Sequence, residues 1–328
     1  MSVAINPSIP YKLGWLPDVP DARDIPFQAV FRVPSKLPAR VDLRGAFSPV
    51  EQQGELGSCT AQALVGCLEF LELQAVNSKL KNRKPARNAT HPTATLERSD
   101  CGLGSVAGGS AIATSPSSGA SGHLAPGADV EKSFRDLSRL FVYYNERKTM
   151  GTVREDSGAM LRTGIKVLKK LGVCRELLWP YAIDKFTLKP KSECYAEAAR
   201  HQVTAYQRLR TLREMKACLA MGLPFVFGFA VYEHAMSAEV RRSGAVRLPG
   251  PHERMIGGHA VAASGYDDAK KVLYFRNSWG AEWGRSGYGT LPYAYPESRD
   301  LSDDFWCIQA TESNLYARWM INAGCALS

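Results

Sequence analysis

The chain has 328 residues, 45% of them hydrophobic and 22% charged, which is typical of a soluble globular protein large enough for one big domain or two lobes. Its net charge of +9 comes from Lys and Arg residues spread along the whole chain, so a nucleic-acid-binding patch is not predicted. The longest strongly apolar stretch, residues 219–231, is too short to cross a membrane and contains Gly222 and Pro224.

The first residues and the cysteines favour a reducing compartment. Residues 1–7 have neither the basic start nor the apolar segment of a signal peptide, so we expect a cytoplasmic location. None of the cysteines forms a C-x-x-C pair, so we expect no metal site, and their low density favours free thiols. The eight are Cys59, Cys67, Cys101, Cys174, Cys194, Cys218, Cys307 and Cys325.

Residues 1–36 form a Pro-rich arm without helical or strand periodicity, and its prolines exclude a long helix. A few apolar residues are scattered along it as anchors: Tyr11, Leu13, Trp15, Leu16 and Phe27. A compact domain is expected to follow, over residues 37–328.

Apolar residues recur at helical spacing between Thr60 and Val76, which predicts an amphipathic helix. Cys59 stands immediately ahead of it, where the positive end of the helix dipole and the unpaired backbone N–H groups favour a thiolate. A buried structural cysteine at a helix start is the alternative, and for a cysteine considered alone it is the more common case.

A second helix is predicted over residues 159–171, with Leu161, Ile165 and Leu168 on its apolar face. Its basic residues fall mostly off that face and are interpreted as a solvated stripe: Arg162, Lys166, Lys169 and Lys170.

Between the two helices, residues 82–132 are dominated by Ser, Gly, Ala, Thr and Pro. This composition buries too little apolar surface to offset the ordering entropy, so we expect a disordered insertion.

The last third of the chain is rich in strand signals, at residues 225–231, 259–266 and 272–276. His259 opens the second of these strands and Asn277 follows the third. Two neighbouring strands joined by a turn bring such ends within reach of an imidazole–amide hydrogen bond. The expected architecture is α+β, with a helical lobe followed by a mainly β lobe.

The other histidines have no comparable position. Two lie in the low-complexity insertion, two in predicted helices and one on a Pro/Gly loop: His91, His123, His201, His234 and His252. An isolated histidine is usually structural, so position alone leaves the role of His259 open.

Four sequence blocks, in order, resemble the papain family of cysteine peptidases, in particular its bacterial members with a short N-terminal extension. Residues 53–59 place a glutamine six residues before the cysteine, and His259-Ala260-Val261 is similar to the family's His-Ala-Val strand. Residues 277–284 match Asn-Ser-Trp-Gly-x-x-Trp-Gly, and residues 41–44 resemble the start of a mature enzyme. The resemblance covers residues 37 to about 300 apart from the insertion. It implies a two-lobe fold, with a helical lobe packed on a β-barrel-like lobe and the active-site cleft between them.

The resemblance also implies roles for individual residues. Cys59 is the nucleophile in a thiolate–imidazolium pair with His259, and Asn277 orients the imidazole. The Gln53 side-chain amide and the Cys59 backbone N–H form the oxyanion hole. For substrate binding it implies Gly158, which pairs with an extended substrate backbone, and Gly57 and Ala260, which line the neighbouring subsites. Trp279 completes the substrate-binding set and shields the His–Asn bond from water. A simple turn is an equal alternative for Gly158.

Three departures from the family pattern surround the site. Thr60 replaces the usual tryptophan after the nucleophile, so packing behind Cys59 must differ. Leu56 stands where many relatives have a disulfide cysteine, and Gly258 precedes the histidine where papain has an acid. None removes a group that the chemistry requires.

The implied function is a cysteine-type endopeptidase that forms a thioester acyl-enzyme on Cys59, acts on polypeptides and uses no cofactor. A catalytically silent peptide-binding protein and an acyltransferase with the same Cys-His-Asn site are the alternatives. The arm, residues 1–36, is predicted either to lie across the groove as an intramolecular inhibitor or to pack on the surface as a strap.

Overall fold

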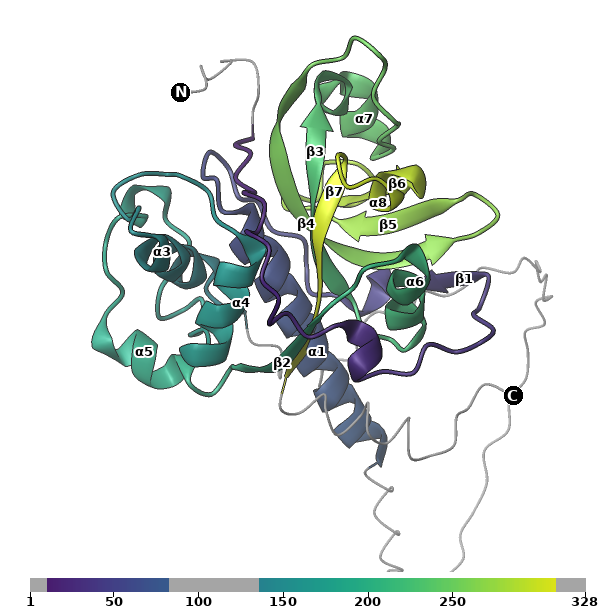
Figure 1. Cartoon of the computed structure of the whole chain (residues 1–328). Helices are drawn as coiled ribbons and strands as arrows, with labels where there is room; N and C mark the ends of the chain where they lie inside the picture. The colour runs from purple at the N-terminus through teal and green to yellow at the C-terminus, as the bar shows by residue number, and fades with distance from the viewer. Residues whose placement is uncertain (1–10, 83–135, 311–328) are drawn as a thin grey trace, which may run out of the picture.

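The computed structural model describes residues 11–82 and 136–310 of the chain. Helices gather on one side and an antiparallel sheet with its covering helices on the other, with the long helix α1 between them (Figure 1). The helices are α1 (Cys59–Asn82), α3 (Arg139–Met150), α4 (Leu161–Lys170), α5 (Ser192–Ala198), α6 (Leu212–Ala220), α7 (Ala238–Ser243) and α8 (Ala294–Glu297). The strands are β1 (Arg40–Asp42), β2 (Val203–Arg208), β3 (Phe225–Tyr232), β4 (Met255–Asp267), β5 (Val272–Arg276), β6 (Tyr288–Pro292) and β7 (Ser302–Ala310). Short 3-10 helices are η1 (Phe27–Ala29), η2 (Arg44–Ala46), η3 (Ile183–Lys185) and η4 (Glu233–Met236).

Helix α1 is the central helix of the core, and the predicted helix at 60–76 lies within it. Residues 59–71 are buried all the way round, because α1 packs against β4 on one side and against α3 and α4 on the other. Its stretch Cys59–Ser78 is long and apolar enough to cross a membrane, but 78% of that window is buried within the protein. This is the pattern of a core helix.

Helix α4 confirms the helix predicted at 159–171, with Leu161 and Ile165 buried. Its three lysines are exposed. The interpretation of Arg162 as part of a solvated stripe is wrong, because Arg162 is buried and its guanidinium lies 2.5 Å from the carboxylate of Asp24 in the arm. The arm supplies a partner that the helical periodicity does not reveal.

The seven-stranded sheet has the order β2-β7-β3-β4-β5-β6, with β1 paired to β4. Strands β3, β4 and β5 confirm the strands predicted near residues 225, 259 and 272. In the antiparallel register Phe229 lies opposite His259 and Arg276 lies opposite Ala262. Asn277, the next residue, is thereby carried toward His259.

The predicted insertion at 82–132 lies outside the described residues, except for Asn82, which ends α1. The described part of the arm, from residue 11, passes between the helices and the sheet (Figure 1). Tyr11, Trp15 and Phe27 are buried, as expected of its apolar anchors.

Candidate active site

Cys59 is the first residue of α1, and its side chain is fully buried. The loop before it turns at Gly54, whose φ of +59° lies in the left-handed region that favours glycine. The backbone amides of Ala260 in strand β4 and of Gly14 in the arm act to lower the pKa of the Cys59 thiol, so both lie close to the sulfur. Ala260 directly follows His259, the base expected from the sequence.

The imidazole of His259 is held by Asn277, with 2.8 Å between Nε2 and Oδ1. The same Oδ1 atom accepts a hydrogen bond from the backbone N–H of Ser278 at 2.8 Å, so it is an acceptor and Nε2 must carry the proton. Nδ1 has no hydrogen-bond partner among the described residues. The neutral ring therefore keeps a free lone pair on Nδ1, as a general base requires.

Trp279 covers this histidine. Its ring stacks on the imidazole at 4.6 Å between centroids and is only 3% exposed. Tyr11 of the arm stacks on Trp279 at 4.7 Å. The indole therefore keeps water away from the His259–Asn277 hydrogen bond.

The side chain of Gln53 is fully buried and has a defined orientation. Its Oε1 accepts from the Ser278 hydroxyl at 2.6 Å, and its Nε2 donates to the carbonyls of Leu56 at 2.8 Å and of Lys12 at 2.9 Å. Ser278 thus fixes the amide with its N–H groups toward Leu56 and toward Lys12 of the arm. Sequence reasoning missed this serine, although it belongs to the Asn-Ser-Trp-Gly block.

Burial controls the ionisation of the pair. It raises the pKa of Cys59 to about 12, against the opposing effect of the Ala260 and Gly14 amides. It lowers the pKa of His259 to about 4, although the hydrogen bond to Asn277 acts in the opposite direction. With the arm in place, the thiol and the imidazole are both neutral near pH 7.

The arm runs through the positions predicted for substrate binding. Ala159 N–H donates to the Gly14 carbonyl at 2.8 Å, and Leu16 N–H donates to the Ala159 carbonyl at 2.9 Å. The arm therefore pairs through its backbone with Ala159, the residue after Gly158. Gly158, with φ +73°, allows the approach, because a Cβ atom there would lie 2.1 Å from the Gly14 oxygen.

Gly14 of the arm and Gly258 of the body allow the same close approach. A Cβ atom on Gly14 would lie 2.0 Å from the Gly57 oxygen, and one on Gly258 would lie 2.7 Å from Trp15. Trp15 N–H also donates to the Gly258 carbonyl at 3.0 Å. The missing acid before His259 therefore makes room for the arm.

Thr60, which replaces the usual tryptophan after the nucleophile, makes a polar contact behind Cys59. Its hydroxyl donates to the buried carboxylate of Glu146 on α3 at 3.0 Å. Burial raises the pKa of Glu146 to about 8, so this acid is mostly protonated at neutral pH. Among the described residues, His201 is hydrogen-bonded to Glu72 and His234 to Glu253.

Comparison with known proteins identifies the family. The model of the papain family cysteine proteases matches residues 151–299. The chain is similar to xylellain, a cysteine protease from Xylella fastidiosa, with 33% identity and a TM-score of 0.69, covering 94% of this chain and 99% of xylellain.

Two further relatives extend the comparison. A peptidase C1-like protein of Acanthamoeba polyphaga mimivirus is 44% identical over 181 residues, which span 52% of this chain and 58% of the viral protein. Procathepsin B S9 from Trypanosoma congolense shares the fold, with a TM-score of 0.57 and 14% identity over 91% of this chain and 85% of the other. The chain belongs to the papain family of cysteine proteases.

Proposed function

We propose that the protein is a cysteine-type endopeptidase that hydrolyses peptide bonds through a thioester on Cys59. The observation that carries the proposal is that one segment of the arm reaches two of the expected groups: Gln53 Nε2 donates to the Lys12 carbonyl, and Gly14 lies at the Cys59 thiol. His259, next to Ala260 at the same thiol, has an Nδ1 atom without a hydrogen-bond partner among the described residues. Family membership supports the same chemistry.

In the proposed reaction, Nδ1 of His259 takes the thiol proton as the sulfur of Cys59 attacks the scissile carbonyl carbon. The Gln53 Nε2 and the Cys59 backbone N–H stabilise the oxyanion, a contribution worth about 2.7–4 kcal/mol for one such donor. His259 then protonates the leaving amine, and a water molecule hydrolyses the thioester. Asn277 keeps the proton on Nε2 throughout, so that Nδ1 faces the chemistry.

We further propose that the arm inhibits the enzyme within the same chain. The carbonyl of Lys12 occupies the Gln53 donor, and Gly14 covers the thiol of Cys59. A substrate carbonyl cannot reach these atoms while the arm is bound. Because the arm also excludes water, it keeps the Cys59–His259 pair neutral and unreactive.

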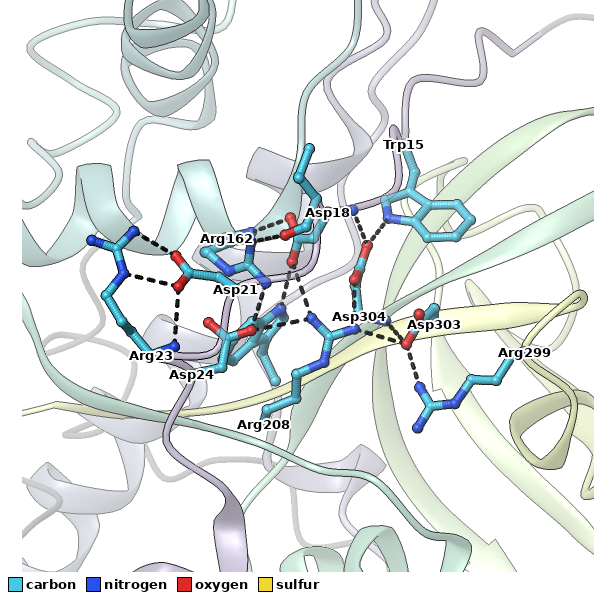
Figure 2. Close-up of polar contacts among 12 residues, drawn as sticks. Trp15, Asp18, Asp21, Arg23, Asp24, Arg162, Arg208, Arg299, Asp303 and Asp304 are labelled. Carbon is cyan, nitrogen blue, oxygen red and sulfur yellow. Dashed lines mark hydrogen bonds and ion pairs between the residues drawn. The ribbon is translucent and has the colours of Figure 1, made fainter.

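The arm is anchored at the end of the cleft by an aromatic side chain and a buried carboxylate (Figure 2). The Trp15 ring packs so closely on β3 that a Cβ atom on Gly228 would lie 1.9 Å from it. Asp304 Oδ2 accepts from Trp15 Nε1 at 3.1 Å and from the Asp18 backbone N–H at 2.8 Å. Asp18 in turn accepts from Trp306 Nε1 at 2.9 Å.

Two arginines of the body, meaning the described residues from 37 onward, complete this anchor (Figure 2). Arg162 of α4 pairs with Asp24 at 2.5 Å and donates its backbone N–H to Asp18. Arg208 of β2 pairs with Asp304 at 2.9 Å and lies 3.6 Å from Asp24. The carboxylates of the arm thus join the helical side to the sheet, which supports a specific docked position over a loose surface strap.

The experiment is labelling with an epoxide inhibitor of papain-like enzymes together with hydrolysis of a fluorogenic peptide pool, in the full chain and in a Trp15→Ala variant that weakens the arm. Cys59→Ala should abolish both signals. Cys67→Ala, which removes another buried thiol of α1, should keep them. Peptide binding without turnover or Cys59-dependent labelling in the Trp15→Ala variant would instead support a silent binding protein.

A further inference from the structure

We infer that Asp156 selects substrates with a basic residue, Lys or Arg, immediately before the scissile bond. This inference rests on the proposed function and adds the substrate class to it. The first observation is the place of the carboxylate. The Gly57 backbone N–H, two residues before the nucleophile, lies 3.0 and 3.1 Å from its two oxygens, and the Tyr143 hydroxyl also donates to it.

The second observation is the residue that now faces this carboxylate. Nζ of Lys12 lies 2.7 Å from Oδ2 of Asp156, while the carbonyl of Lys12 accepts from Gln53 Nε2 at 2.9 Å. One residue therefore presents its carbonyl to the proposed oxyanion hole and its ammonium group to Asp156. A substrate residue whose carbonyl enters the same hole has its side chain within reach of the same acid.

The carboxylate keeps its position when the arm leaves, because its other partners belong to the body. Tyr143 and Gly57 hold both oxygens, and with the arm docked the Asp156 side chain is 12% exposed. A fixed and partly desolvated charge attracts a cation more strongly than a mobile surface charge does. When Lys12 leaves with the arm, the Asp156 carboxylate therefore loses its cation and can accept one from a substrate.

In the described residues of the body, no basic side chain forms an ion pair with the Asp156 carboxylate. The guanidinium of Arg147 lies 4.2 Å from the centre of the Tyr143 ring, and its N–H groups donate to the carbonyls of Val153, Glu155 and Phe186. Arg147 is thus engaged behind Tyr143. Lys12 is the cation that ion-pairs with Asp156 in the described part of the chain.

The test uses the full chain in the Trp15→Ala background, with fluorogenic peptides that differ only in Arg, Lys or Gln before the scissile bond. We expect kcat/KM to favour Arg and Lys over Gln by roughly tenfold, as for a hydrogen bond to a charged group. Asp156→Asn keeps the acceptor oxygen for Tyr143 and Gly57 but removes the charge. It should bring the ratio close to one, by lowering kcat/KM for the Arg and Lys peptides more than for the Gln peptide.

The matched control is Glu155→Gln, which removes the exposed charge next along the chain and should keep the preference. An Arg/Gln ratio near one before mutation, or a ratio equally reduced by Glu155→Gln and Asp156→Asn, would overturn the inference while peptide hydrolysis itself persists. Absence of turnover for every peptide, with Cys59 unlabelled, would overturn the proposed function as well.

Discussion

Trp15→Ala in the full chain should open the cleft. The indole is 8% exposed, fills the space left by Gly228 and Gly258, and donates to Asp304. Truncation of a buried tryptophan to alanine costs about 3–5 kcal/mol. If about 3 kcal/mol of this cost falls on docking of the arm, the population of the open state rises by roughly a hundredfold, since each 1.4 kcal/mol is a factor of ten.

The assay is the second-order rate constant for alkylation of Cys59 by the epoxide, with thermal unfolding recorded for each variant. Trp15→Phe is the graded control, because it keeps an aromatic ring but loses the N–H donated to Asp304. Its rate should rise by about tenfold at most, the value of a hydrogen bond to a charged acceptor. A folded Trp15→Ala protein that is labelled at the wild-type rate would refute inhibition by the arm.

Two further predictions concern the oxyanion donor and a buried acid. Gln53→Ala should lower kcat by about 10²–10³. Ser278→Ala removes the hydrogen bond that orients the Gln53 amide, so it should lower kcat by roughly tenfold with KM nearly unchanged. Equal losses of kcat in the two variants would contradict the idea that Ser278 acts only by orienting Gln53. The pKa of Glu146 is raised from 4.5 to about 8 in the folded protein, so its contribution to stability is present below pH 4.5 and lost as the pH rises through 8. Urea unfolding should therefore show wild type losing stability relative to Glu146→Gln over this range, by at most about 1.4 kcal/mol per pH unit; parallel pH profiles would contradict it.

The central part of the fold could be predicted because local patterns determine it. Helix α4 and strand β5 follow from apolar periodicity, and the run around residues 225–231 is buried in β3, as its composition predicts. The proximity of His259 and Asn277 followed from two strands joined by a turn. In each case the relevant partners lie close in sequence or on adjacent strands.

The anchor of the arm could not be predicted in this way. Trp15 and Asp304 are 289 residues apart, and neither lies in a motif that specifies the other. Arg162 has the spacing of a solvated residue, yet a carboxylate of the arm buries it. Similarly, the helix start at Cys59 favours a thiolate, but burial of the side chain in the folded protein raises the thiol pKa.

The arm remains attached to the body near the active site even when the segment around Trp15 dissociates. Phe27 is fully buried, and the Arg208 backbone N–H donates to the Ile25 carbonyl at 2.9 Å, so the chain is fixed about ten residues beyond Trp15. A flexible tether of that length spans only about 20 Å, which corresponds to a local concentration in the millimolar range. Recapture is therefore a first-order event, independent of enzyme concentration, and a competing peptide must match that local concentration. A single cut between Leu16 and Ile25 would abolish this advantage and convert a reversible closure into permanent release.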